Sequence, residues 1–331
     1  MKNNVLLVGG AGYIGSVLTE HLLSRGFNVK CFDALIYSQK QNIKKFLKRK
    51  NYEFTFGDIR KEALVESSLK NIKDVVILAG LVGDPITKKY PKEAKEINFT
   101  ALKNFINICK NKNLDKLIFI STCSNYGLMR NNEIADENCN LNPLSDYAKH
   151  KVEIEKHILS LKGHVDYSPI ILRFATAFGL SPRMRFDLTI NHFTKELICK
   201  KLLNIYDVNT WRPYCHVNDF AKLIEIVLLE KKEKIQFQIF NAGSDENNFT
   251  KKNIIDEIVK IVPSKNIIFE KGGIDQRNYR VNFEKVQKVL NFKTRYTIQH
   301  GIKEICEAIN SNLFHNSNEN IDHLGNFKIK L

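Results

Sequence analysis

The start of the chain constrains the fold more than any other stretch. A short apolar run at residues 5–8 is followed at once by a glycine-rich turn and then by a helical pattern at residues 16–25. The turn carries Gly9, Gly12 and Gly15, with Tyr13 and Ile14 before the last glycine. Glycine permits unusual φ angles and a close approach of backbone to a pyrophosphate. The order of strand, turn and helix therefore predicts a dinucleotide site, with its phosphates at the helix N-terminus.

A carboxylate follows the second strand at the expected distance. The apolar residues 28–32 end in Asp33, about 20 residues beyond the glycines. A carboxylate there accepts hydrogen bonds from the ribose hydroxyls of the adenosine and repels a 2′-phosphate. No arginine stands at residues 34–37 to receive such a phosphate. The sequence therefore predicts NAD(H) rather than NADP(H) as the cofactor.

Strand and helix patterns alternate through the first half of the chain. Strands are expected at residues 52–56, 74–78, 117–120 and 168–174, and helices at residues 42–50, 62–69, 91–110 and 145–161. This alternation predicts an α/β fold, with a doubly wound parallel sheet of the Rossmann type and a smaller C-terminal substrate domain. The expected domains are residues 1–174, which bind NAD, and residues 175–310, which bind substrate, with some segments returning to the first domain.

The second half has a looser pattern. We expect a loop at residues 179–188, a helix at 189–200, a loop at 211–216, a helix at 218–231 and a strand at 237–240. Residues 311–331 form a polar tail that is expected to be poorly ordered or loosely docked.

Composition limits the classes of function. The 331 residues carry a formal net charge of +15, but the lysines are scattered. A basic surface spread over the whole protein is therefore favoured over a nucleic-acid site. No apolar run reaches 18 residues, so no membrane partner is expected. The absence of room for a signal peptide before the first strand favours the cytoplasm. The seven cysteines show no CxxC pair or zinc-like spacing, which predicts reduced thiols and no metal.

A possible catalytic set follows the fifth strand. Thr122 lies at the end of that strand, where open α/β sheets bind ligands. Tyr147 and Lys151 are four residues apart on a helix and share one face. A neighbouring ammonium and the positive nicotinamide ring favour the phenolate and are expected to lower the pKa of Tyr147. The phenol is then suited to move the proton of a sugar hydroxyl while hydride passes to or from the cofactor.

Together these motifs resemble the extended short-chain dehydrogenase/reductase family over nearly the whole chain. The resemblance implies a Rossmann domain with a C-terminal substrate domain, nucleoside-diphosphate sugars as substrates, and a homodimer formed by helices at residues 91–110 and 145–161. It implies the following cofactor contacts: Gly9, Gly12, Tyr13, Ile14, Gly15, Asp33, Asp58, Ile59, Leu78, Ala79, Gly80, Asn98, Ser121, Tyr147 and Lys151.

The resemblance also implies a set of substrate residues. Arginine suits a diphosphate because its guanidinium forms bidentate hydrogen bonds, although each arginine also fits a surface salt bridge. Arg212 and Arg277 are the stronger candidates for the diphosphate, and Arg183 and Arg185 the weaker ones for sugar or phosphate. The full implied set is Thr122, Cys123, Ser124, Asn191, Arg183, Arg185, Arg212 and Arg277.

The chain departs from one branch of this family. In the 4,6-dehydratases the threonine is followed by Asp-Glu, the acid and base of water elimination, whereas here Cys123 and Ser124 stand in those places. Elimination is therefore disfavoured, and Cys123 is either a packed side chain or a proton donor. His216 and His192 are expected to be structural. Residues 178–188 also resemble a subgroup that includes GDP-heptose C4 dehydrogenases.

The resulting expectation is an NAD-dependent enzyme that transfers hydride at C4 of a nucleotide sugar. A 4-epimerase is favoured over a net C4 dehydrogenase or 4-keto-reductase, because it needs only Tyr147, Lys151 and Thr122. A dinucleotide-binding regulator without catalysis is the alternative of another class.

Overall fold

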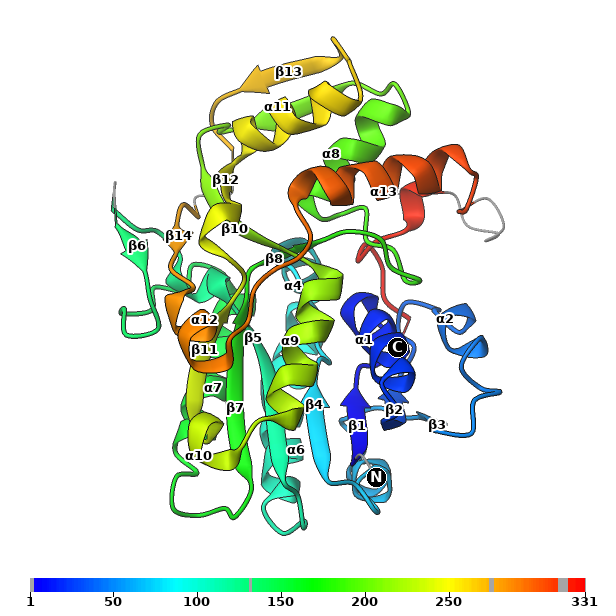
Figure 1. Ribbon diagram of the computed structural model, residues 1–331, viewed down its shortest axis with the longest axis vertical. Helices are drawn as coiled ribbons and strands as arrows, with labels where there is room; N and C mark the ends of the chain where they lie inside the picture. Colours follow the sequence, from blue (N-terminus) through cyan, green and yellow to red (C-terminus); the bar gives the residue numbers. More distant parts are fainter. Residues whose placement is uncertain (1–2, 131–132, 274–276, 315–320, 331) are drawn as a thin grey trace.

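A sheet of seven parallel strands forms the centre of the computed structural model, which describes residues 3–130, 133–273, 277–314 and 321–330. The order across the sheet is β11-β7-β5-β4-β1-β2-β3 (Figure 1). The order runs outward from β1 and β4, and a crevice therefore forms at the carboxyl ends of these two strands. The strands are β1 (Asn4–Val8), β2 (Asn28–Asp33), β3 (Tyr52–Phe56), β4 (Asp74–Ile77), β5 (Lys116–Thr122), β7 (Ser168–Phe174) and β11 (Gln238–Ala242).

Helices cover both faces of the sheet, and each face has its own core. On β1, Val5 and Leu7 belong to one apolar cluster, whereas Leu6 and Val8 belong to another. This alternation is the pattern of a parallel strand that is buried on both sides. The first cluster includes α1 (Tyr13–Ser24) and α9 (Val217–Leu229), and the second includes α3 (Glu62–Ser68), α6 (Leu102–Cys109) and α7 (Asp146–Leu159).

The helix expected at residues 91–110 is helical throughout but not uniform. It consists of α5 (Pro91–Lys95), a π-helical turn η1 (Glu96–Ala101) and then α6. A π turn inserts an extra residue and rotates the side chains that follow, and such turns are frequent at functional sites. The helix expected at residues 42–50 is much shorter and is α2 (Gln41–Lys44).

A second, smaller unit stands above the carboxyl edge of the sheet (Figure 1). We refer to it as the lid; its small sheets have the orders β12-β10-β8 and β13-β9. Its apolar core combines side chains from α8, α11 and α13. Its elements are β8 (Thr176–Phe178), α8 (Thr189–Ile198), β9 (Leu203–Tyr206), β10 (Trp211–His216), β12 (Asn248–Thr250), α11 (Lys251–Ile261), β13 (Ile267–Glu270) and α13 (Ile298–Asn310).

One expectation for the second half was wrong and another was confirmed. Residues 211–216 are a strand, β10, and not a loop, because β8 and β12 supply partners on both of its sides. The strand expected at residues 237–240 is confirmed as β11, which pairs with β7 and so returns to the central sheet. The short elements that remain are β6 (Ile134–Ala135), β14 (Arg280–Val281), α4 (Asp84–Lys89), α10 (Lys232–Ile235), α12 (Glu284–Leu290), η2 (Cys123–Tyr126), η3 (Asp245–Asn247) and η4 (Ile321–His323).

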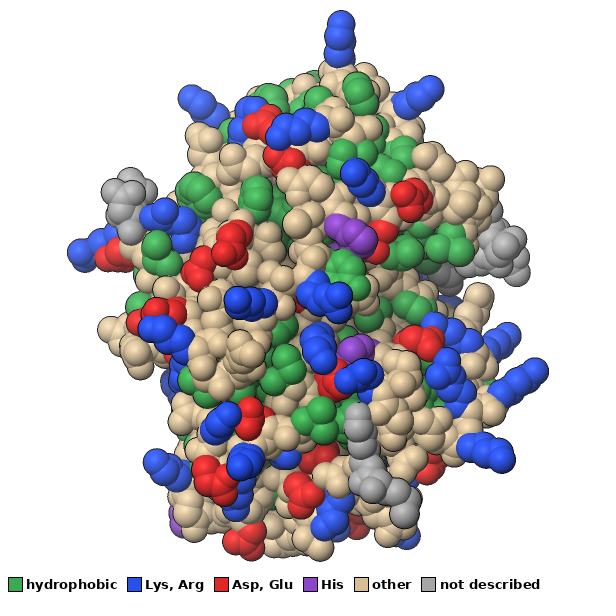
Figure 2. Space-filling view, viewed as in Figure 1, with side chains coloured by type: hydrophobic (Ala, Val, Ile, Leu, Met, Phe, Trp, Pro, Cys, Tyr) green, Lys and Arg blue, Asp and Glu red, His purple; other side chains and the backbone are tan. Residues whose placement is uncertain are grey.

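Basic side chains are dispersed on the face that Figure 2 shows, where lysines and arginines alternate with acidic residues. In the described part of the chain, no helix combines the length and apolar character that crossing a bilayer requires. All seven cysteines are free thiols in the structure.

Candidate active site

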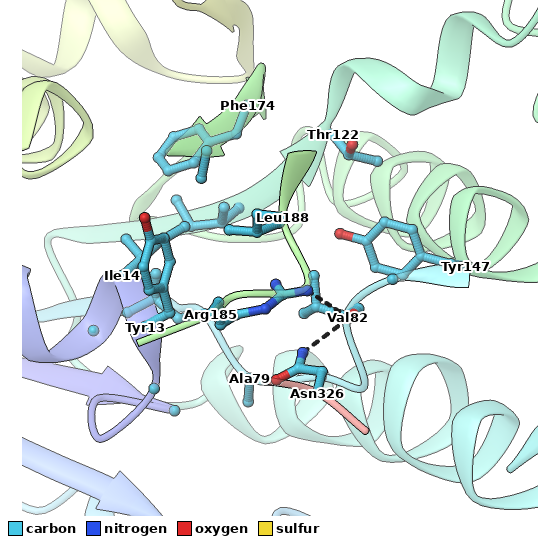
Figure 3. A pocket seen from close by; sticks show the side chains of 18 of the residues that line it. Tyr13, Ile14, Ala79, Val82, Thr122, Tyr147, Phe174, Arg185, Leu188 and Asn326 are labelled. Carbon is cyan, nitrogen blue, oxygen red and sulfur yellow. Dashed lines mark hydrogen bonds between the residues drawn. The ribbon is translucent and has the colours of Figure 1, made fainter. Parts of the chain in front are cut away.

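A deep cavity lies at the carboxyl ends of β1, β4 and β5, below the lid. The expected cofactor and substrate residues meet along its wall, and Figure 3 shows Tyr13 and Ile14 on one side with Thr122 and Tyr147 opposite. Of the expected residues, the wall includes Gly9, Gly12, Tyr13, Ile14, Gly15, Asp33, Asp58, Ile59, Leu78, Ala79, Gly80, Ser121, Thr122, Ser124, Tyr147, Lys151, Arg183, Arg185, Arg212 and Arg277.

The glycine turn leaves space and donors for a pyrophosphate. Gly9 has a φ of +85°, and a Cβ on it would approach the main chain of Ala79 to 2.7 Å. Gly12 precedes α1 and offers no capping side chain, so the first-turn N–H groups of the helix keep their donor capacity. The helix N-terminus lines the cavity, which is the arrangement that binds anionic phosphates. The residues therefore fit the diphosphate of a dinucleotide.

Asp33 is oriented by main-chain donors. Its two carboxylate oxygens accept hydrogen bonds from the N–H groups of Ala11 (3.0 Å) and Leu35 (2.7 Å). Burial raises the pKa of Asp33, while these bonds and the charge of Arg183 oppose the rise. Oδ1 also accepts a hydrogen bond from Gln39 Nε2 at 3.3 Å, whereas Oδ2 has a second lone pair with which it can accept a ribose hydroxyl.

Tyr147 and Lys151 share the inner face of α7, as their spacing predicts. The helix begins after Ser145, whose side chain accepts a hydrogen bond from the Ala148 N–H at 3.3 Å. Lys151 Nζ donates to the main-chain oxygen of Ile120 at 2.7 Å and lies 5.9 Å from the centre of the Tyr147 ring. The bond to Ile120 fixes the ammonium at the end of β5.

The expected lowering of the Tyr147 pKa is not present in the protein without cofactor. Burial raises the pKa of the phenol well above its usual value. The charges of Arg185 and Arg277 lower this pKa, and that of Asp84 raises it. Burial also lowers the pKa of Lys151 to about 7, so the ammonium is itself destabilised.

A buried ion pair supports this helix from behind. Glu155, one turn after Lys151, is 2% exposed and pairs with Arg173 at 2.7 Å. The Glu155 carboxylate also accepts a hydrogen bond from Ser121, which lines the cavity. Sequence reasoning missed this network, although the i, i+4 spacing of Lys151 and Glu155 on the catalytic face was a visible signal.

The substrate side of the cavity contains a chain of polar contacts. Arg277 Nη1 lies 3.2 Å from Asp84 Oδ2 and donates to Ser124 Oγ at 3.3 Å. Ser124 Oγ also lies 3.2 Å from the phenol oxygen of Tyr279. The Arg212 guanidinium lies over the Tyr279 ring, 5.0 Å from its centre. Asp84 and Tyr279 were not expected from the sequence.

Arg183 and Arg185 occupy different parts of the cavity. Arg185 is paired with Asp187 at 2.5 Å and extends toward Val82, as Figure 3 shows. Arg183 lies over the Tyr37 ring at 4.3 Å, close enough to Asp33 to affect its pKa. Arg183 therefore lies at the Asp33 end of the cavity, and its expected role at the sugar or phosphate stays a prediction.

Two expected site residues, Asn98 and Asn191, lie behind the cavity wall. Asn98, in the π turn η1, bonds both the N–H (2.7 Å) and the oxygen (2.9 Å) of Leu81, and so shapes the loop that follows Gly80. Asn191 is fully buried at the junction with the lid, where it accepts from the Gly179 N–H at 2.9 Å. Neither amide is part of the cavity wall, and each is bonded to main-chain groups of the loops that border the cavity.

Cys123 and His216 are both packed in the interior. The Cys123 thiol is 1% exposed, donates to the main-chain oxygen of Arg173 at 3.2 Å and has a pKa raised by burial. The structure therefore favours the packed alternative for this thiol over a proton donor. His216 is fully buried, caps α9 by accepting from the Asn218 N–H at 3.2 Å, and lies 2.7 Å from Glu304, which confirms its structural role.

Comparison with known proteins gives a consistent assignment. Residues 5–243 match the model of the NAD dependent epimerase/dehydratase family. A putative UDP-glucose 4-epimerase of Methanocaldococcus jannaschii is 26% identical over 314 residues, which cover 93% of this chain and 99% of that protein. A dTDP-D-glucose 4,6-dehydratase of Dictyostelium discoideum is 30% identical over 258 residues, which cover 73% and 58% of the two chains.

Solved structures share the fold. The UDP-glucuronic acid 4-epimerase of Bacillus cereus, in complex with UDP-glucuronic acid and NAD, superposes with a TM-score of 0.83 at 23% identity, over 93% of this chain and 99% of that one. The UDP-glucose 4-epimerase of Thermus thermophilus, in complex with NAD, gives a TM-score of 0.81 at 21% identity and the same coverage. The chain belongs to the NAD-dependent epimerase/dehydratase family and is an NAD-dependent enzyme of the extended short-chain dehydrogenase/reductase type.

Proposed function

We propose that the enzyme inverts C4 of a nucleoside-diphosphate sugar by oxidising this carbon and reducing it again from the other face. The observation that carries the proposal is the composition of the cavity wall around Tyr147. The phenol of Tyr147 and the hydroxyl of Thr122 face the cavity, while a dehydratase would need an acid and a base at positions 123 and 124. Here those positions hold a buried thiol and a serine that contacts Arg277.

Tyr147 carries the proton in this proposal. Its phenol removes the proton of the C4 hydroxyl during oxidation and returns it during reduction. Bound NAD⁺ supplies the hydride acceptor and adds a positive charge beside the phenol, which favours its ionised form. Thr122 has an oxygen that already accepts from the Ser124 N–H at 3.1 Å, so its hydroxyl proton remains available to orient the C4 oxygen.

Lys151 positions both the phenol and the cofactor. One of its three donors is committed to Ile120, and the two that remain can reach the nicotinamide ribose. Its positive charge at the end of β5 adds to the field that stabilises a phenolate once the cofactor is bound.

Arg212 and Arg277 are proposed to bind the diphosphate of the substrate. Both line the cavity on the lid side and lie next to one another, since Arg212 donates to the main-chain oxygen of Arg277. The cavity wall there also includes Lys251, the first residue of α11. Three cations at one end of a cavity are suited to a doubly charged diphosphate.

A panel of nucleotide sugars tests the proposal. The protein is incubated with UDP-, dTDP- and GDP-linked sugars, including a GDP-heptose, and the products are followed by NMR and mass spectrometry. Inversion at C4 without a change in mass is expected for one or more members. Loss of two hydrogens would instead establish a net dehydrogenase, and loss of water a dehydratase. Binding of NAD without conversion of any member would favour the regulator.

A homodimer is proposed as the working form. α6 and α7 lie side by side on one face of the sheet, so a second copy can pack against both and form a four-helix bundle. Light scattering after size exclusion should give twice the chain mass of 38.2 kDa. A cytoplasmic location stays a prediction from the sequence.

A further inference from the structure

The C-terminal segment, residues 321–330, contributes a buried amide to the cofactor cavity. Asn326 is 7% exposed and lines the same cavity as Gly9 and Asp33. Its Nδ2 donates to the Val82 oxygen at 2.9 Å, and its Oδ1 accepts from Arg183 Nη1 at 2.6 Å. Figure 3 shows Asn326 and Arg185 directed at the same main-chain oxygen of Val82. The expectation of a poorly ordered or loosely docked tail is therefore wrong for this segment.

The segment is fixed to the lid at its beginning. The Phe186 N–H donates to the Leu324 oxygen at 2.8 Å. The Asp322 carboxylate lies 2.8 Å from Lys195 Nζ and 2.7 Å from Lys201 Nζ. These two lysines hold the pKa of Asp322 at about 2, so the ion pairs persist at neutral pH.

The other end of the segment is fixed to a loop and a helix of the Rossmann domain. The Lys330 N–H donates to the Ile36 oxygen at 2.7 Å, and Lys89 Nζ donates to the Phe327 oxygen at 3.0 Å. Ile329 is buried in the apolar cluster that also contains Ile36. In Figure 1 the red segment accordingly runs from the lid down to the region of α1 and α2.

The middle of the segment crosses the adenosine half of the cavity. Arg183, which bonds Asn326, lies over the Tyr37 ring and shifts the pKa of Asp33, the residue expected at the ribose. Arg183 Nη2 also donates to the Gly325 oxygen at 3.1 Å. The contacts of Asn326 thus join Arg183, at the base of the lid, to Val82, in the loop after β4, beside the ribose position.

We propose that residues 321–330 form a strap that retains NAD, and that Asn326 is the positioning residue on its inner face. Because the strap is attached to both the lid and the Rossmann domain, the cofactor leaves only after these attachments open. The inference rests on the proposed function in one respect, since a cycle that returns its own hydride needs no exchange of cofactor between turnovers.

Release of NADH measures this retention without any sugar. The full chain is loaded with NADH and mixed with excess NAD⁺, and the decay of NADH fluorescence gives the release rate. Asn326→Ala removes one charge-assisted bond, whose loss should speed release by about tenfold. A chain that ends at residue 320 should release NADH faster still. Because a strap gates passage in both directions, the rate of NADH entry should rise as well.

Matched variants separate gating from general loosening. Lys328→Ala alters an exposed residue of the same segment and should release NADH at the wild-type rate. Asp322→Asn weakens the attachment to the lid without touching the cavity, and should also speed release. This variant tests the proposal even where the shortened chain fails to fold. Unchanged release in Asn326→Ala and Asp322→Asn, or equally fast release in Lys328→Ala, would overturn the proposal. The release of NADH is measured without any sugar, so it can be interpreted even where no sugar of the panel is converted. The two proposals can therefore be refuted independently.

Discussion

Lys151 Nζ donates a 2.7 Å hydrogen bond to the main-chain oxygen of Ile120, at the point where β5 reaches the cavity. Lys151 as a whole residue is 3% exposed. Burial lowers the pKa of its ammonium to about 7, although the negative charge of Glu155 raises this pKa. The catalytic helix therefore holds a cation whose proton is bound weakly near neutral pH. The contact fixes the position of this cation but does not remove the cost of burying it.

This cost should be visible as a pH-dependent difference in stability. The pKa of Lys151 is about 7 in the folded protein and 10.5 in the unfolded chain. Between these values the unfolded chain binds more protons, so stability rises with pH over this window and the cost is complete below pH 7. Lys151→Met removes the charge, and its Tm relative to wild type should be highest below pH 7 and fall toward pH 9.

Lys149→Met is the matched control for this measurement. Lys149 lies on the same helix with a side chain that is 57% exposed, so its substitution should shift Tm by the same small amount at every pH. A Lys151→Met difference that does not change with pH would contradict the proposed burial cost. In activity assays, Lys151→Met should lower both turnover and NAD affinity.

Removal of the phenol oxygen should separate chemistry from binding. Tyr147→Phe keeps the ring and its packing, so NAD binding should remain close to wild type. Turnover should fall by about 10²–10⁴-fold, the usual contribution of a positioned acid/base. Tyr279→Phe is the control, because it removes the phenol that contacts Ser124. Its effect on turnover should be much smaller. A Tyr147→Phe enzyme that kept more than about a tenth of its turnover would mean that another group moves the proton.

The charge of Asp84 should set the pH at which the phenol ionises. Asp84 raises the pKa of Tyr147, so Asp84→Asn lowers it, and the midpoint of the pH profile for substrate-dependent NADH formation should move to lower pH. The Arg277 partner of Asp84 then acts without a counter-charge and shifts the profile in the same direction. Single-turnover absorbance over a pH series measures the midpoint.

Asp146→Asn is the control, because Asp146 directly precedes Tyr147 but has a side chain that is 65% exposed to solvent. Its charge is screened by water, and the profile should not move. An Asp84→Asn profile that coincided with that of wild type would show that Asp84 does not act on the phenol.

The sheet and the cofactor half of the site could be predicted because their signals are local. Buried parallel strands appear as apolar runs, and the glycine turn needs its residues at fixed spacing. β10 was missed because Pro213 interrupts its pattern and its partners come from distant segments. Asn326 was missed because its bonds reach Val82 and Arg183 across most of the chain, and nothing in the tail's own sequence signals them. The polarity of Asn98 was visible, but the π turn that aims it at Leu81 was not.

Loss of the diphosphate arginines should weaken the substrate and spare the cofactor. Arg212→Ala and Arg277→Ala each remove a charged contact that is worth about 1.5–3 kcal/mol. The dissociation constant of the nucleotide sugar should therefore rise by about tenfold to a hundredfold, while that of NADH changes little. Calorimetry with the preferred sugar nucleotide, and NADH fluorescence, measure the two separately. An arginine whose loss weakened NADH instead would belong to the cofactor side.

Asp33 should determine the choice between the two nicotinamide cofactors. Its carboxylate is buried and anchored by Ala11 and Leu35, so it faces a 2′-phosphate with little freedom to move away. Wild-type protein should therefore bind NADH more tightly than NADPH, as measured by cofactor fluorescence. Asp33→Ala removes both the repulsion of the 2′-phosphate and the contact with the ribose. The affinities for NADH and NADPH should therefore become more similar.

Arg183 should also influence the choice of cofactor. Its guanidinium lies close enough to Asp33 for the two charges to shift each other's pKa. In Asp33→Ala this guanidinium loses its nearby carboxylate and can attract a 2′-phosphate, so NADPH should gain affinity beyond the relief of repulsion. The double variant Asp33→Ala/Arg183→Ala should lose that additional gain, while Arg183→Ala alone should favour NADH further. Equal NADPH affinity in the single and double Asp33 variants would show that Arg183 does not reach the 2′ position, and equal or tighter NADPH binding by wild type would refute the role of Asp33 itself.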